Sequence, residues 1–178
     1  MPAPRNDASV DYALVGGGIM SATLAILLTE LDPTATIHVY ERLVEPAQES
    51  SDAWRNAGTG HAALCELNYT PERSDGSIDI TKAIAVNKQF KASRELWDYL
   101  AASGAITAGT PFVSAVPHMT FVSGSDGVDY LRRRHEALVT HPNFSEMAYS
   151  EDPAVIGEWA PLLTEGRLGS EPIAAPRS

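Results

Sequence analysis

The stretch that decides the fold is residues 10–21, which read VDYALVGGGIMS. Its first half, residues 10–15, is short and mostly apolar, as is typical of a buried parallel strand. From Ile19 onward the apolar residues recur at helical spacing. A strand that passes into a helix through three consecutive glycines predicts a tight turn, with backbone amides gathered at the start of the helix.

The residues that follow complete a strand–helix–strand unit. The helical pattern runs from Met20 to Leu31, and the pair Asp32-Pro33 predicts its end because proline disfavours a helical residue before it. Residues 36–40, TIHVY, are rich in β-branched and aromatic side chains and predict a second strand. The sequence therefore predicts an α/β fold that begins with a βαβ unit and two parallel strands.

Residues 16–21 also fit the G-x-G-x-x-G/A pattern of dinucleotide-binding turns, with serine in the last position. Gly16 would permit the tight turn, Gly18 would let the backbone approach a pyrophosphate, and Ser21 would keep the helix close to the strand. Glu41 follows the second strand, where a carboxylate binds an adenosine ribose and repels a 2′-phosphate. We therefore expect a Rossmann-type unit that binds the ADP half of a dinucleotide, with FAD favoured, NAD open and NADP disfavoured.

Residues 43–76 predict a long irregular connection, and long loops in compact proteins are often functional. Its centre, residues 50–61, reads SSDAWRNAGTGH and concentrates small residues, amides and hydroxyls. Such a stretch can line the pyrophosphate and ring of a flavin by close backbone approach. A flexible loop without a ligand is the alternative.

The remaining pattern is mixed. A long helix is expected from Asp79 to about Gly104, an extended segment over 113–122 and a turn over 124–127. A further helix carries Val128, Leu131, His135 and Leu138 on one face, and Asp152-Pro153 predicts the start of a short helix that ends near Trp159. Residues 166–178 show no periodicity and predict an irregular tail.

Composition excludes several classes of function. The 13 basic and 23 acidic residues give a net charge of −10, which disfavours a nucleic-acid partner. The adjacent Arg132, Arg133 and Arg134 are interpreted as a solvated face. Cys65, the single cysteine, can form no intramolecular disulfide and fits a reducing cytoplasm, and no metal site is expected. Residues 1–7 do not resemble a signal peptide, and no apolar stretch is long enough to cross a bilayer, so we expect a cytoplasmic protein.

Several of these segments together resemble the malate:quinone oxidoreductase family. They are the glycine motif GGGIMSATLAILL, the ER after the second strand, SSDAWRNAGTGHAALCELNYTPE, DGSIDITKA, VPHMTFVSG, and the run from YLRRRHEAL to EWAPLLTEGR. The resemblance covers almost the whole chain, from about Asp11 to Pro172. NAGTGHAALCELNYTP is long enough to make a chance match an inadequate explanation.

The resemblance implies an FAD enzyme of the glutathione-reductase-like superfamily. It would oxidise (S)-malate to oxaloacetate in the tricarboxylic acid cycle and pass electrons to membrane quinone, through peripheral contact with the inner face of the cytoplasmic membrane. His61 and His118 lie in family-like segments and are candidates to approach the substrate, although a lone histidine is more often structural. No catalytic base and no oligomeric state is assigned. The implied FAD-binding residues are Gly16, Gly18, Ser21, Glu41, Arg42, Ser51, Asn56, Ala57, Gly58, Thr59 and Gly60.

The family resemblance also implies a longer protein, because its FAD-binding fold is completed by a C-terminal segment. We therefore expect a truncated chain: residues 8–76 as part of an FAD-binding domain, 77–165 as a region leading into a substrate domain, and 166–178 as the tail. Three alternatives remain open at this point. One is a partial nucleotide-binding module or remnant without catalysis, and another is a related flavin oxidoreductase acting on an amine or another hydroxy acid. The third is an NAD-dependent dehydrogenase, which the glycine motif and Glu41 alone do not exclude.

Overall fold

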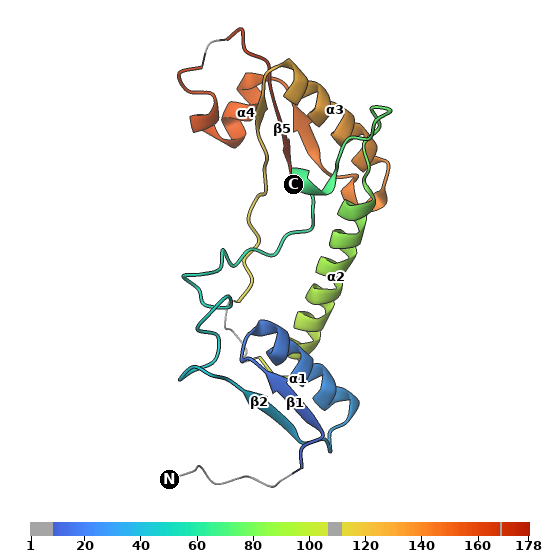
Figure 1. Ribbon diagram of the computed structural model, residues 1–178. Coiled ribbons are helices and arrows are strands. Elements are labelled where there is room, and N and C mark those ends of the chain that lie inside the picture. The colour runs from blue at the N-terminus through green and yellow to red at the C-terminus, as the bar shows by residue number, and fades with distance from the viewer. Residues whose placement is uncertain (1–8, 107–111, 168) are drawn as a thin grey trace. The chain divides into compact units, whose positions relative to one another are not determined.

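The computed structural model describes residues 9–106, 112–167 and 169–178 (Figure 1). The chain divides into two compact units, one ending at Thr59 and the other spanning Gly60–Ser178. Its class is mixed α/β, with one small parallel sheet and one small antiparallel sheet. None of the helices in the described ranges is both long and apolar enough to span a membrane.

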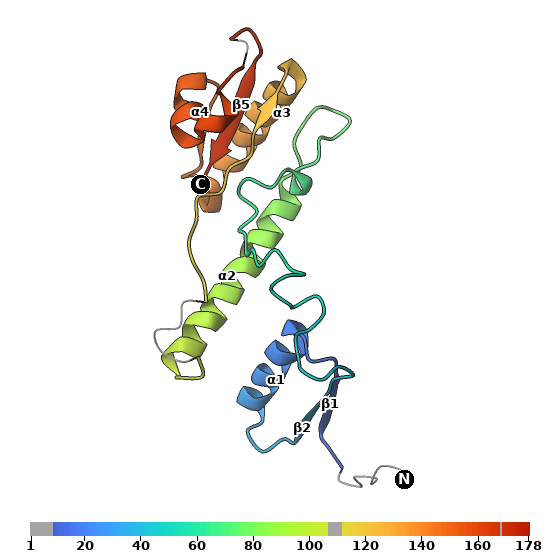
Figure 2. The ribbon, with the colours of Figure 1, turned by 90° about the vertical axis from the view of Figure 1, so that its left-hand side faces the viewer.

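The N-terminal unit is a βαβ unit, as the sequence predicts. Strand β1 (Tyr12–Val15) pairs in parallel with β2 (Ile37–Tyr40), and helix α1 (Ile19–Leu31) connects them. The register places Tyr12 opposite Ile37 and Val15 opposite Tyr40. Figure 2 shows α1 lying beside the strand pair. The helix ends with Asp32 as its C-cap, one residue before the proline that disfavours its continuation.

No residue of the range 9–59 is buried. The apolar side chains expected to face a core are instead open to solvent, with Val15 88% exposed, Met20 81% and Leu31 82%. The two strands and one helix of this unit therefore form with their hydrogen bonds in place but without a hydrophobic core of their own.

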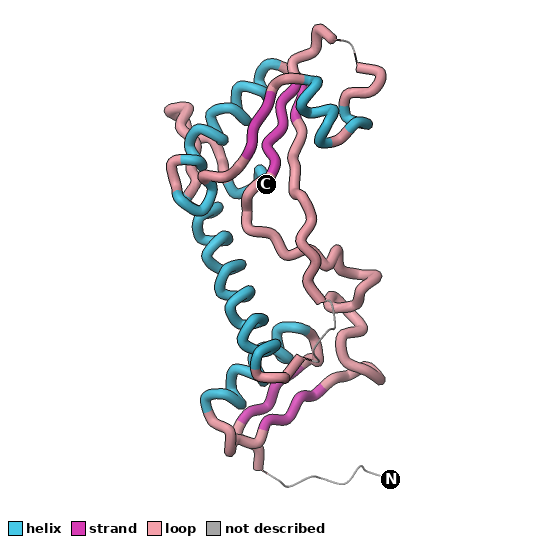
Figure 3. Tube along the Cα trace, turned by 180° about the vertical axis from the view of Figure 1, so that it is seen from behind, coloured by secondary structure: helices cyan, strands magenta, loops and turns pink. Residues whose placement is uncertain are grey.

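The second unit is built around a three-stranded antiparallel sheet in the order β3-β5-β4. Figure 3 shows these strands in magenta among the helices of the same unit. The elements in chain order are η1 (Leu67–Tyr69), α2 (Thr81–Ala102), β3 (Val122–Ser123), α3 (Ser125–Val139), η2 (Pro142–Phe144), β4 (Ala148–Ser150), α4 (Pro153–Trp159), η3 (Pro161–Leu163) and β5 (Ile173–Arg177).

All the buried residues of the described chain belong to this second unit, and most of the hydrophobic ones form three clusters. The first lies between the loop after Gly60, α2 and η2, and includes Ala63, Ala83 and Phe144. The others lie on the two sides of β5, one against α3 through Leu131 and one against α4 through Ile156. The central strand thus organises most of the core.

The expectation of an irregular tail over 166–178 is wrong for residues 173–177. These form β5, the middle strand of the sheet, with Ala174 opposite Val122 and Ala175 opposite Ser150. Residues 173–176 are all buried, so the alternation of polar and apolar residues that marks a half-exposed strand is absent. Pro176 further obscured the pattern, since proline is rare inside sheets.

Two other expectations need correction, and both concern α3. The expected turn over 124–127 is wrong, because Gly124 is the N-cap, with φ of +83°, and the helix begins at Ser125. The solvated arginine face is wrong for Arg134, which is fully buried. Arg132 is exposed, Arg133 is half-buried, and both pair with carboxylates. Arg134 lies three residues after Leu131 and four before Leu138, and so falls on the buried side of the helix.

The other predicted helices are confirmed. Helix α2 begins two residues after Asp79, whose carboxylate accepts a hydrogen bond from the Thr81 amide at 2.9 Å. Helix α4 begins at Pro153, where the Asp152 side chain caps the Ala154 amide at 2.8 Å. Both starts use the acceptor that the sequence placed before the helix.

Candidate functional site

The glycine turn lies between β1 and α1 as the motif requires. Gly16 has a φ of +91°, in the left-handed region that glycine occupies without strain, and its amide donates to the Tyr40 carbonyl at 2.8 Å. Gly18 is the N-cap of α1 and has no side chain to cover the helix start. The turn therefore exposes the amides of the first helical turn, which have no intrahelical acceptors.

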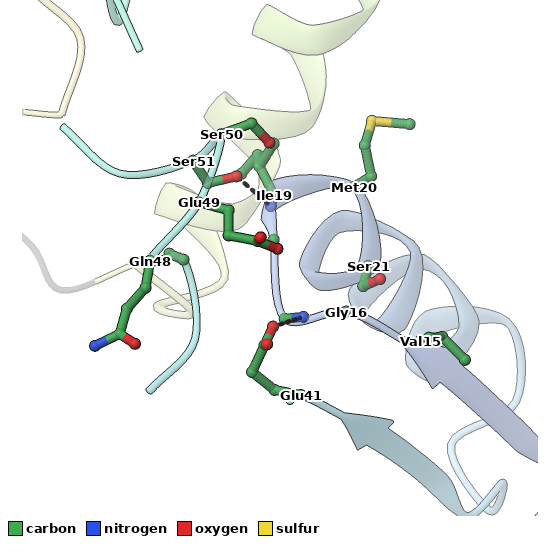
Figure 4. Close-up of a pocket in the computed structure, with 13 residues that line it drawn as sticks. Val15, Gly16, Ile19, Met20, Ser21, Glu41, Gln48, Glu49, Ser50 and Ser51 are labelled. Atoms are coloured by element: carbon green, nitrogen blue, oxygen red, sulfur yellow. Dashed lines mark hydrogen bonds between the residues drawn. The ribbon is translucent and has the colours of Figure 1, made fainter. Parts of the chain in front are cut away.

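Glu41 binds this turn directly. Its carboxylate accepts from the Gly17 amide at 2.7 Å (Figure 4) and from the Leu43 amide at 2.9 Å. These hydrogen bonds stabilise the charged form, the bond from Gly17 most strongly, and lower the pKa of Glu41. The acid at the end of β2 is thus held, ionised, against the glycine turn.

Ser51 reaches the same turn from the following loop. Its hydroxyl accepts from the Ile19 amide at 2.9 Å, the other interaction drawn in Figure 4. A Cβ at Gly18 would lie 3.2 Å from this hydroxyl, so the close approach depends on glycine. The sequence predicts that Gly18 and Ser51 lie near a pyrophosphate, and the structure brings these two residues close together.

The loop that precedes Ser51 also packs on the turn, which the sequence did not reveal. The Ala47 amide donates to the Gly17 carbonyl at 3.1 Å, and a Cβ at Gly17 would lie 2.9 Å from the Pro46 side chain. Residues 45–49 were interpreted only as part of an irregular connection. A proline followed by alanine carries no ligand-binding signal, so periodicity and motif spacing could not have found this contact.

Together these segments line an open cavity of about 240 Å³, which we name the glycine-turn cavity. Of the predicted cofactor residues, it brings together Gly16, Gly18, Ser21, Glu41 and Ser51. Small-molecule sites commonly measure about 300–1,000 Å³, so the glycine-turn cavity has room for part of a dinucleotide rather than for all of it. Its lining residues are Val15, Gly16, Gly17, Gly18, Ile19, Met20, Ser21, Glu41, Ala47, Gln48, Glu49, Ser50 and Ser51.

Arg42 lines a neighbouring cavity of about 630 Å³ with Leu43, Asp52, Trp54 and other residues of the same loop. Its guanidinium pairs with the Glu49 carboxylate, and both side chains are more than half exposed. Glu49 lines both cavities. The structure therefore places Arg42 next to the glycine-turn cavity but outside its lining.

The predicted flavin-side residues, 56–60, do not line the glycine-turn cavity. Asn56 stabilises its own loop, with its side chain donating to the Ser50 carbonyl at 2.8 Å and accepting from the Gly58 amide at 2.7 Å. Ala57 and Thr59 are exposed, and Gly58 has a φ of +64°. Gly60, the first residue of the second unit, packs so closely on Phe90 that a Cβ would lie 2.7 Å from its ring.

His61 and His118 are brought together in the second unit, with ring centroids 6.2 Å apart. Both are half-buried, and His61 also stacks on Tyr69 at 5.6 Å. Burial lowers the pKa of His118, and the positive charge of His61 lowers it further. The histidines that the sequence offered separately therefore form a pair. No group of three or more potential metal ligands occurs in the described residues.

The whole described chain has the sequence of one family. The model of the malate:quinone oxidoreductase family matches residues 8–178. The chain belongs to this family. The match includes β5 and reaches Ser178, beyond Pro172, where the resemblance seen in the sequence ended.

Curated relatives agree with this assignment. The chain is 54% identical over 177 residues to a probable malate:quinone oxidoreductase of Bradyrhizobium diazoefficiens, covering 99% of this chain and 34% of the relative. It is 57% identical over 177 residues to one of Chromohalobacter salexigens (99% and 35%), and 53% identical over 175 residues to one of Xylella fastidiosa (98% and 31%). The chain thus spans about a third of the length of the relatives it matches.

Proposed function

We propose that this chain is the N-terminal part of an FAD-dependent malate:quinone oxidoreductase, and that the glycine-turn cavity binds the ADP half of FAD. The complete enzyme would oxidise (S)-malate to oxaloacetate in the tricarboxylic acid cycle. It would pass the electrons to membrane quinone at the inner face of the cytoplasmic membrane. The names of the relatives support the malate and quinone parts of this proposal.

The observation that carries the cofactor proposal is the contact of Glu41 with the glycine turn. A strand, a left-handed glycine, an open helix start and a carboxylate at the end of the neighbouring parallel strand are the parts of a Rossmann-type nucleotide site. In this chain the carboxylate lies 2.7 Å from the Gly17 amide. A Cβ at Gly17 would crowd Pro46 and one at Gly18 would crowd Ser51, so the close packing of the loop on the turn depends on glycine.

Each residue would have a separate role toward FAD. The amides at the start of α1 would bind the pyrophosphate, since a helix N-terminus carries partial positive charge. Glu41, already ionised, would accept the ribose hydroxyls, and Ser51 would exchange its bond with the Ile19 amide for a phosphate oxygen. Bound FAD would supply a hydride acceptor for malate oxidation. The chain's own contribution is binding and orientation of the ADP half.

A second candidate is a nucleotide-binding module without catalysis. The specific observation in its favour is that no residue of 9–59 is buried, so the unit that carries the site has little packing to stabilise it. We therefore expect the 178-residue chain to bind FAD weakly and to turn over malate poorly or not at all. Malate-dependent dye reduction by the purified chain would contradict this expectation.

Calorimetric titration with ADP tests the nucleotide site in the chain as it stands. We expect ADP to bind at least about tenfold more tightly than 2′,5′-ADP, because Glu41 repels the additional phosphate. Glu41→Gln should weaken ADP binding and reduce the preference between the two nucleotides. Glu45→Gln is the matched control, since Glu45 is exposed, lies four residues away and does not line the glycine-turn cavity.

Equal affinity of the chain for ADP and 2′,5′-ADP would contradict the assigned role of Glu41. So would identical behaviour of the Glu41 and Glu45 variants. The flavin itself is tested by incubating the chain with FAD and desalting it. Retained absorption bands of oxidised flavin would support the complete proposal, whereas ADP binding without flavin retention would favour the module without catalysis.

A further inference from the structure

The second unit contains a polar cluster that the nucleotide proposal does not use. His61 and His118 lie with their ring centroids 6.2 Å apart, although they come from segments far apart in the sequence. His61 stacks on Tyr69, and the Lys82 ammonium lies 4.9 Å from the centre of the same tyrosine ring. The Tyr69 ring therefore contacts one imidazole of the pair and the Lys82 ammonium group.

Hydrogen bonds fix the His61 ring and the main chain of His118. His61 Nδ1 accepts from the Ala63 amide at 3.3 Å, so the neutral ring carries its proton on Nε2. The His118 carbonyl accepts from the Ser178 amide at 3.0 Å and from the Cys65 thiol at 3.1 Å. His61 thus keeps a donor that its own loop does not use, and the main chain of His118 is held in place.

The backbone beside His61 is strained and held by buried groups. Ala63 is fully buried with a φ of +60°, in the left-handed region that residues other than glycine rarely adopt. The side chain of Asn87 donates to the Ala62 carbonyl at 2.9 Å, and Arg134 donates to the Leu64 carbonyl at 2.8 Å. Strain of this kind persists only where the surroundings enforce it, and it occurs often at ligand-binding positions.

Charged groups of both signs lie near His118. Burial lowers the pKa of His118 most, and the positive charges of His61 and Arg134 lower it further, while Glu66 opposes them. Another group nearby is the Cys65 thiol, whose pKa is raised by burial. A negative ligand between the rings would stabilise both imidazolium forms.

We propose that His61 and His118 form a binding site for a carboxylate group. One carboxylate oxygen would accept from His61 Nε2, and the other would accept from the protonated ring of His118. Charge-assisted hydrogen bonds of this type are stronger than neutral ones. The site is independent of the nucleotide site, and only its assignment to a dicarboxylate substrate rests on the proposed function.

Protonation of the histidine pair and binding of the carboxylate should be coupled, and this coupling can be measured as a change in the pKa of His118. If the protonated pair binds the carboxylate more tightly, binding must raise the pKa of His118, and affinity must increase as the pH falls. A rise of about one pKa unit at saturation corresponds to about tenfold tighter binding by the protonated form. A structural histidine pair without a ligand would show neither effect.

The experiment is an NMR titration of the histidine ring protons of the 178-residue chain. The pKa values are measured in succinate and in sodium chloride of equal ionic strength, with acetate as a monocarboxylate comparison. We expect succinate to raise the pKa of His118 by about one unit relative to chloride. His135 is the internal control, because burial also lowers its pKa but it stacks on Tyr149 rather than on the pair.

A variant separates binding from nonspecific effects. His61→Gln should weaken succinate binding about tenfold, whereas His38→Gln, which removes a histidine from β2, should leave it unchanged. An equal pKa of His118 in succinate and chloride overturns the proposal, and so does unaltered affinity in a folded His61→Gln variant. ADP titration reports separately on the proposed function. Binding of succinate without ADP would refute the nucleotide site alone, and binding of ADP without succinate would refute the carboxylate site alone.

Discussion

Replacing Arg134 with methionine should strongly destabilise the unit Gly60–Ser178. The guanidinium is fully buried and donates to the Thr70 hydroxyl at 2.7 Å and to the carbonyls of Leu64 and Glu66 at 2.8 and 3.1 Å. Methionine fills much of the same volume but leaves these acceptors without their donor. An orphaned buried acceptor costs about 1–3 kcal/mol.

The expected loss of stability is smaller than the summed cost of the three orphaned acceptors, because the substitution also removes a poorly compensated buried charge. Among the described residues Arg134 has no carboxylate within ion-pair distance, and its Nη1 has no hydrogen-bond partner. Burial accordingly lowers its pKa. Removing an unpaired buried charge is favourable, so we expect a net loss of about 3 kcal/mol in the free energy of unfolding.

Urea denaturation followed by tryptophan fluorescence measures this loss. A Trp54→Phe background removes the one tryptophan of the N-terminal unit, so that Trp97 and Trp159 report on the unit of interest. Arg132→Met is the matched control, since Arg132 is on the same helix but exposed and paired with Glu151. Equal urea midpoints for the two variants would refute the reasoning that the buried guanidinium holds the loop 64–70.

Three further predictions follow from burial and hydrogen bonding. Backbone amides of β1 and α1 should exchange with solvent faster than those of β5, because residues 9–59 have no buried side chains whereas β5 is almost wholly buried; equal protection in NMR exchange would contradict this. Cys65 should react slowly with a thiol reagent in the native chain and rapidly in urea, because it is fully buried and its pKa is raised; rapid native labelling would show that its loop opens. The pKa of Glu41 is lowered in the folded chain, so the stabilisation from its bond to the Gly17 amide should be complete above about pH 4.5 and lost as the pH falls through the folded pKa. If the NMR chemical shift of the Gly17 amide does not change over this pH range, the assignment is contradicted.

The βαβ unit could be predicted from sequence because its signals are local. The strand β1, the glycine turn and α1 follow one another without a gap, and proline marks the helix end. That Glu41 lies near the glycine turn was also predictable, because β1 and β2 are parallel and parallel strands end at the same edge of a sheet. The packing of Pro46 and Ala47 on Gly17 was not, since it depends on how an irregular loop folds back.

The errors have a common physical origin in burial from two sides. Strand β5 lies between β3 and β4, with α3 packed on one side and α4 on the other. It therefore needs no polar face, and its sequence shows no alternation of polar and apolar residues. Arg134 occupies a helical position that the spacing of apolar residues assigns to the core, but its charge led to the prediction that its side chain is exposed to solvent. Local pattern cannot distinguish a solvated arginine from one whose donors are satisfied by carbonyls of a distant loop.

The contrast between the two units connects the proposed nucleotide site with stability. In residues 9–59 the glycine-turn cavity is held by single hydrogen bonds, from Gly17 to Glu41 and from Ile19 to Ser51, rather than by a buried core. A ligand that binds only the folded form stabilises it by about 2.7 kcal/mol at a hundred times its dissociation constant. For a unit with so little packing this contribution would be comparable to its own stability. Binding of the ADP half and ordering of the βαβ unit should therefore occur together, and slowed exchange of the β1 and α1 amides in ADP would accompany any true occupancy of the cavity.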